Sequence, residues 1–151
     1  MNTSNFSRDD WILGGVTLLL VITLLFLPWF SIGGGSIGTV SIPSVDLTAT
    51  GTPDGWLGIL AVLAAIALIA DLAVDRLSPQ TALPSIGGSR VQTRFVLACI
   101  TAVFVALKFL FHIHFSLFGF GFYVAVILTI ALVYVAMQAR SGVTLGAPGA
   151  V

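Results

Sequence analysis

Three ionisable residues lie inside strongly apolar stretches of the chain, where a charge requires an explanation. Asp71 and Asp75 are four residues apart, so they share one face of a helix, and Lys108 lies in a separate apolar run. A charge inside a bilayer is costly and marks a functional site by default. We therefore take Asp71, Asp75 and Lys108 as the candidate intramembrane polar site.

The two aspartates have a structural alternative. They lie at the carboxyl end of their predicted helix, where the helix dipole already disfavours negative charge. Arg76, Arg90 and Arg94 are the cations available on the same side. One hypothesis is a salt-bridge network among these side chains. The other is a proton or cation site at the mouth of a helix bundle.

Lys108 has structural alternatives of its own. It lies fourteen residues beyond Arg94, or about 21 Å along a helix at 1.5 Å per residue. Its long apolar stem could lift the ammonium group to the headgroups, a behaviour known as snorkelling. A salt bridge to Asp46 or Asp54 is the second alternative.

The remaining reactive side chains form no recognisable catalytic or metal-binding pattern. His112 and His114 point in different directions on a helix, so they cannot share a metal there. Cys99 is the only cysteine, which excludes an intrachain disulfide. Gly33–Gly35 lack the lysine and the following helix of a phosphate-binding loop. We expect no enzyme activity, no cofactor and no metal site.

The amino-acid composition is that of a membrane protein, so we expect the candidate polar residues to lie on helices within a bilayer. Of 151 residues, 58% are hydrophobic and 8% are charged, against about 25% charged in a soluble domain. The formal net charge is zero and no basic stripe exists, so we expect no nucleic-acid partner. The lipid bilayer is the expected surrounding.

Four apolar runs, each close to the length that crosses a bilayer, predict four transmembrane helices at 11–30, 55–74, 95–113 and 117–137. The predicted fold class is an all-α integral membrane protein, a four-transmembrane-helix bundle in one domain over residues 1–142 with a flexible cytoplasmic tail at 143–151.

Ser7 and Asp10 form a capping-box pattern before the first run. The first run is longer than the apolar core of a signal peptide and closes with Pro28. We therefore expect it to remain in the protein as a transmembrane helix and not to be cleaved as a signal peptide.

The connection at 31–54 is the longest polar segment between predicted spans. Val40 and Ile42, and after Pro43 the residues Val45 and Leu47, alternate with polar neighbours. Alternation at period two is typical of half-buried strands. We expect a small extracytoplasmic β-hairpin lying on the membrane surface.

Arginine positions predict which side of the membrane each segment faces. Cationic residues near helix ends are retained in the cytoplasm. The arginines fall at the amino terminus, in the second connection and at the carboxyl terminus, namely Arg8, Arg76, Arg90, Arg94 and Arg140. The first and third connections contain no Lys or Arg. We expect a multi-pass protein of the cell membrane with both termini cytoplasmic.

Aromatic and small residues predict how the helices sit and pack. Trp11, Trp29 and Trp56 are expected to anchor the helices at the membrane interfaces. Helices in lipid associate through close contact of small residues. Two small-residue stripes are expected to serve this packing, either within the chain or against another subunit: Gly58, Ala61 and Ala65 in the second run, and Ala98, Ala102 and Ala106 in the third.

The layout resembles the claudin-type tetraspan plan, which has four helices, cytoplasmic ends and a longer first outer loop that forms strands. Claudins carry a Trp-Gly-Leu-Trp signature and a cysteine pair in that loop, and this chain has neither. The segments Leu27–Phe30 and Asp54–Trp56 also resemble those of uncharacterised small four-span membrane proteins of bacteria. These resemblances imply a membrane architecture and no activity.

Two functional hypotheses follow. The first is a small noncatalytic membrane protein that acts as an assembly, accessory or scaffold subunit, as a homo-oligomer or with a membrane-protein partner. The alternative is a small oligomeric transporter or channel for protons, cations or a small solute, using Asp71, Asp75 and Lys108.

Overall fold

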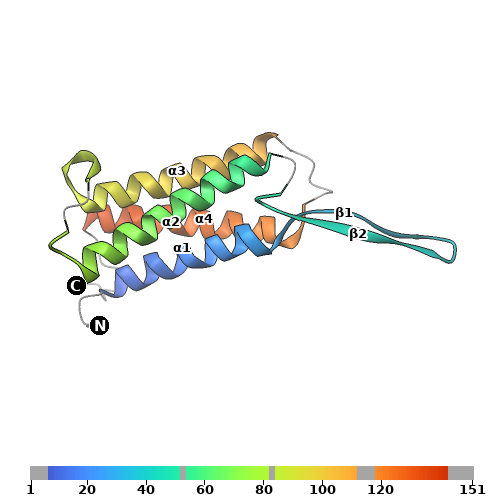
Figure 1. Ribbon diagram of the computed structural model, residues 1–151, viewed down its shortest axis with the longest axis horizontal. Helices are drawn as coiled ribbons and strands as arrows, with labels where there is room; N and C mark the ends of the chain where they lie inside the picture. Colours follow the sequence, from blue (N-terminus) through green and yellow to red (C-terminus); the bar gives the residue numbers. More distant parts are fainter. Residues whose placement is uncertain (1–6, 52–53, 82–83, 112–117, 143–151) are drawn as a thin grey trace, which may run out of the picture.

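The computed structural model describes residues 7–51, 54–81, 84–111 and 118–142. Within them lie four helices long and apolar enough to cross a membrane, and one two-stranded hairpin (Figure 1). In chain order the elements are α1 (Arg8–Phe26), β1 (Pro28–Ile37), β2 (Val40–Thr48), α2 (Gly55–Leu77), the short 3-10 helix η2 (Ile86–Gly88), α3 (Arg90–Phe111) and α4 (Phe120–Ser141). The expected helix bundle with a hairpin is thus confirmed in outline. The predicted tail at 143–151 lies outside the described residues.

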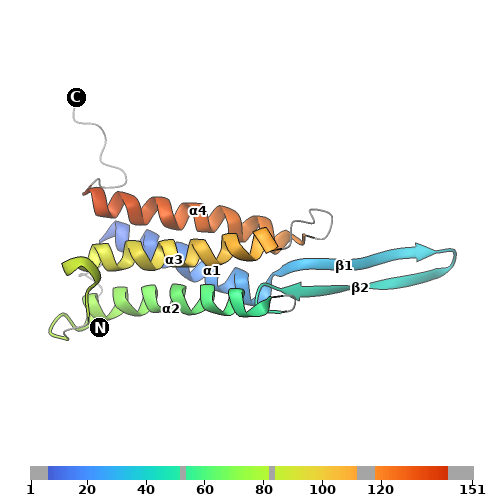
Figure 2. The same ribbon diagram turned by 90° about the horizontal axis from the view of Figure 1, so that it is seen from above.

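The helices lie side by side in a ring in which each packs most extensively against two neighbours: α1 against α2 and α4, and α3 against α2 and α4. Their facing sides form one apolar core, in which Leu20, Leu57, Leu68 and Leu132 are fully buried. The amino end of α1 and the carboxyl end of α4 lie at the same end of the bundle (Figure 2). We call this the terminal end, and the opposite end, from which the hairpin extends, the hairpin end.

The predicted capping box starts α1 and is confirmed. The Ser7 hydroxyl accepts a hydrogen bond from the Asp10 backbone N–H at 3.1 Å, and the Asp10 carboxylate accepts one from the Ser7 N–H at 2.9 Å. These two bonds satisfy backbone donors that a helix start otherwise leaves unpaired.

The first span ends earlier than predicted, at Phe26 rather than Phe30. Leu27 is already extended, with φ −85° and ψ 144°. A residue before proline is pushed out of the helical region by contact with the proline ring, and Pro28 supplies that ring. The aromatic residues after it therefore begin β1.

The predicted hairpin is present, but it does not lie flat against the end of the bundle. β1 and β2 pair antiparallel, with Ile32 opposite Val45 and Ile37 opposite Val40. Gly38 begins the two-residue turn with φ +65°, a conformation that favours glycine. In both views the hairpin extends beyond the helices, roughly along their direction (Figures 1 and 2).

The two predicted small-residue stripes face different surroundings. Gly58, Ala61 and Ala65 are buried on α2, and Ala98 is buried on α3. A Cβ at Gly58 would lie 2.0 Å from the Ala49 carbonyl oxygen, so this glycine packs against the end of the hairpin segment. Farther along α3, Ala102 is half-buried and Ala106 is exposed, and both line a groove described below.

Replacing Gly58 by alanine should therefore destabilise the protein. The new methyl group must displace backbone, and overpacking of this kind costs about 1–3 kcal/mol. The measurement is the free energy of unfolding of Gly58→Ala in mixed detergent micelles. Gly15→Ala is the matched control, because nothing lies within 4 Å of a Cβ there. Equal stability of the two variants would contradict the close approach at Ala49.

Candidate functional site

Six charged side chains gather at the terminal end of the bundle. They come from the first turn of α1, the last turns of α2 and the first turns of α3. We call them the charge cluster: Asp10, Asp71, Asp75, Arg76, Arg90 and Arg94. Three carboxylates face three guanidinium groups, so the cluster is neutral as a whole.

Arg94 joins three helices at the centre of the cluster. Its Nε donates to Asp71 Oδ2 at 2.9 Å, and its Nη2 donates to the Asp75 carboxylate in a close ion pair. Its Nη1 lies 3.8 Å from Asp10 Oδ1 on α1. The Arg94 side chain is only 7% exposed. A guanidinium presents five N–H donors in a fixed plane, which allows one buried cation to serve several carboxylates.

The other two arginines complete the pairing from the outside. Arg76 Nη2 lies 2.8 Å from Asp10 Oδ2, and Arg90 Nη1 donates to Asp71 Oδ1 at 2.9 Å. Arg76 and Arg90 are more exposed than Arg94. The cluster is therefore shielded on its bundle side and is partly exposed through Arg76, Arg90 and Asp75.

The sequence analysis left open whether Asp71 and Asp75 form a salt-bridge network or an ion site. The structure places both in ion pairs with arginine. It also adds Asp10, which the sequence analysis treated only as a capping residue. The sequence contains a usable signal for Asp10. This residue directly precedes the first predicted span, and the start of that span lies at the same end of an antiparallel helix pair as the end of the second.

Lys108 is not part of this cluster. It lies near the hairpin end, about 21 Å along α3 from Arg94 at the rise of an α-helix. The three residues proposed as one polar site therefore belong to two separate regions of the bundle.

The surroundings of Lys108 differ from the snorkelling alternative, whereas the suggested link to Asp54 is present as an electrostatic attraction. It is 1% exposed, so its stem does not snorkel to the bundle surface. Its Nζ donates to the backbone carbonyl of Asp54 at 3.2 Å and lies 5.7 Å and 6.0 Å from the ring centroids of Phe30 and Trp29. Asp46, the other suggested partner, accepts a hydrogen bond from Ser31.

Trp29 is placed differently from the interface anchor that was predicted. Its side chain is 1% exposed and meets Phe122 of α4 edge to face, with 5.3 Å between ring centroids. The early end of α1 turns this ring inward as part of β1. Trp11 and Trp56, by contrast, are 61% and 54% exposed. Their role as interface anchors stays a prediction.

His112 and His114 lie outside the described residues. Within the described ranges, no three His, Cys, Asp or Glu side chains come together in a way that could hold a metal ion.

Comparisons with protein-family models, with curated proteins and with solved structures find no match for this chain. The candidate sites therefore rest on the geometry given above.

Loss of the central guanidinium should destabilise the bundle strongly. Arg94→Gln leaves the buried Asp71 carboxylate and the partly exposed Asp75 carboxylate short of a cation, and breaking a buried pair costs about 3–5 kcal/mol. The free energy of unfolding in mixed micelles measures the effect. Arg8→Gln, at an exposed position on the same end, is the control and should change it little. If both variants were equally stable, Arg94 would not hold the helices together.

Proposed function

We propose that this chain is a small noncatalytic integral membrane protein that acts as an assembly or accessory subunit, and that its projecting hairpin receives a membrane-protein partner. The single observation that carries the proposal is this hairpin, which is exposed over most of its length beyond a closed helix bundle. The following steps argue from its surface, its base and its place in the membrane.

The surface of the hairpin is suited to contact. A two-stranded hairpin is marginally stable in water by itself. Four large apolar side chains on it are 43–65% exposed: Ile32, Val40, Ile42 and Val45. Exposed edges of natural sheets usually carry charges that discourage pairing, whereas Asp46 is the only charged residue in either strand. A partner that covers these residues would bury apolar area and complete the sheet.

The base of the hairpin is firmly held, so the exposed part is presented in a defined direction. Trp29 and Phe30 are buried against the bundle. The Gly119 N–H donates to the Trp29 carbonyl at 2.9 Å, and Phe30 forms a β-bridge with Phe118 just before α4. A surface that is ordered before binding loses less conformational entropy when a partner docks.

The arginine distribution supports an extracytoplasmic hairpin and cytoplasmic termini. Arg8 and Arg140 lie at the terminal end together with the three arginines of the charge cluster. Retention of such residues in the cytoplasm orients a multi-pass protein. The partner would then meet the hairpin outside the cell membrane.

The alternative of an oligomeric proton or cation transporter has less support. Each oxygen of the Asp71 carboxylate accepts a hydrogen bond from an arginine, and Asp75 is paired with Arg94. A cation would have to displace these guanidinium groups before it could bind. The accessory role needs no such rearrangement.

A charge placed on the apolar part of the hairpin should dissociate the proposed assembly. We expect wild-type protein, extracted gently from its native membrane, to migrate above the monomer in blue-native electrophoresis. Ile42→Lys should migrate as the monomer, because lysine opposes burial of this position. Gln80→Lys, at an exposed position of the terminal end, is the control and should retain the assembly. A wild-type protein that migrates only as a monomer would contradict the proposal.

The proposed orientation has a separate test by thiol labelling. In a Cys99→Ser background, a membrane-impermeant maleimide should label Ser41→Cys in intact cells. Ser141→Cys, at the exposed end of α4, should react only after permeabilisation. The reversed pattern, with Ser141→Cys labelled in intact cells and Ser41→Cys only after permeabilisation, would refute the orientation alone. Labelling of both positions from the same side would contradict the three crossings that separate them.

A further inference from the structure

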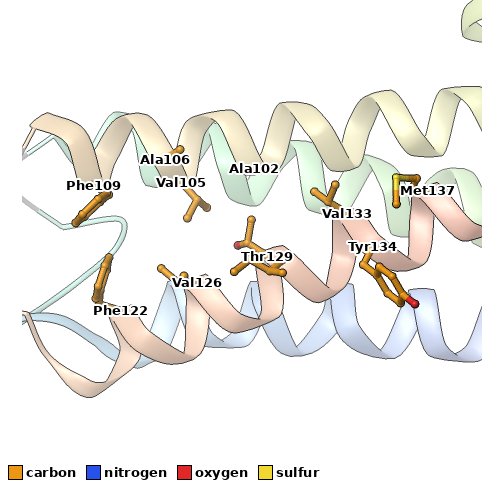
Figure 3. Close-up of a pocket in the computed structure, with 11 residues that line it drawn as sticks. Ala102, Val105, Ala106, Phe109, Phe122, Val126, Thr129, Val133, Tyr134 and Met137 are labelled. Atoms are coloured by element: carbon orange, nitrogen blue, oxygen red, sulfur yellow. The ribbon is translucent and has the colours of Figure 1, made fainter.

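A groove with a volume of about 600 Å³ runs between α3 and α4 (Figure 3). We call it the α3–α4 groove. Its walls come from facing stripes of the two helices: Ala102, Val105, Ala106 and Phe109 on α3, and Phe122, Val126, Thr129, Ile130, Val133, Tyr134 and Met137 on α4. The small alanines of α3 leave room that longer side chains would fill.

The lining dictates an apolar occupant. None of the lining residues is charged. The Thr129 hydroxyl donates to the Ala125 carbonyl at 2.7 Å, so it is satisfied within α4. Figure 3 shows Phe109 and Phe122 facing each other at one end, with Tyr134 and Met137 near the other. A polar molecule placed along this groove would lose hydration without gaining hydrogen bonds.

The length and position of the groove favour a lipid chain. From Phe122 to Met137 the groove follows fifteen residues of α4, about 22 Å at the rise of a helix. One leaflet supplies about half of the ~30 Å hydrocarbon core. An acyl chain can thus lie extended in the groove, which opens along the side of two helices apolar enough to span the membrane.

The terminal end of the groove carries a cation. Arg140 follows Met137 by three residues, so the lining stripe of α4 continues to it. Its guanidinium lies 5.0 Å from the ring centroid of Phe95 on α3 and therefore reaches across from one wall of the groove to the other helix. Arg140 is exposed and lies outside the charge cluster. Within the described ranges no carboxylate forms a salt bridge with it.

We propose that the α3–α4 groove holds one acyl chain of an anionic phospholipid, and that the phosphate of this lipid binds Arg140. The apolar walls select the chain, and the cation at the groove end selects the headgroup charge. The inference is independent of the hairpin and of the assembly role proposed above.

The test counts lipids retained by the purified full-length protein. Protein is equilibrated in micelles with equal amounts of phosphatidylglycerol and phosphatidylcholine and examined by native mass spectrometry. We expect one retained phosphatidylglycerol per chain. Ala106→Phe should abolish retention, because the ring fills the groove from an exposed position and leaves the core unchanged. Ala67→Phe, at an exposed position of α2, is the matched control and should retain the lipid.

The headgroup is tested with Arg140→Gln and its control Arg8→Gln. Removal of one basic residue near the surface should lower the preference for phosphatidylglycerol over phosphatidylcholine about fivefold, whereas Arg8→Gln should leave it unchanged.

Equal retention by Ala106→Phe and Ala67→Phe would overturn the groove assignment, and an unchanged preference in Arg140→Gln would overturn the phosphate contact. Efficient disulfide dimers of Ile130→Cys in a Cys99→Ser background would show that a second copy occupies the groove, and would also overturn the proposal.

Discussion

A buried charge needs a partner of opposite sign, because lipid and packed side chains cannot solvate it. Arg94 meets this requirement with carboxylates from two other helices, Asp10 on α1 and the Asp71 and Asp75 pair on α2. The rest of the bundle depends on this arrangement, because it sets the relative height of three helices. Apolar packing alone would tolerate sliding of one helix along another, since one leucine face resembles the next.

The two ends of the bundle are held by different interactions. Ion pairs hold the terminal end, whereas aromatic packing holds the hairpin end. There Phe118 stacks on Phe122 with 4.0 Å between ring centroids, and Trp29 meets Phe122 at its edge. Lys108 lies beside this aromatic group and bonds to the backbone at Asp54, next to the start of α2. A cation beside aromatic rings retains part of its electrostatic stabilisation without exposure to water.

The sequence predicts features that depend on local patterns, including the four spans, the capping box of Ser7 and Asp10, and the strands of the hairpin. It also brings Asp71 and Asp75 together, since their spacing along one helix is fixed. Features that depend on the approach of distant segments were missed. Asp10 and Arg94 are far apart in the chain, and nothing local indicates that they meet. The burial of Trp29 depends on the early end of α1 at Pro28 and on the distant ring of Phe122, so the local pattern alone indicates an interface anchor.

Only Leu27 separates the last helical residue of α1 from the first residue of β1. So short a connection places the base of the hairpin directly at the end of α1, where the contacts of Trp29 and Phe30 with Phe122 and Phe118 hold it. A force on the tip of the hairpin would therefore act on the start of α4 as well as on the end of α1. The opposite end of α1 is held by the ion pair of Asp10 with Arg76. The first helix is therefore fixed at both of its ends, although it has only one neighbour in the chain.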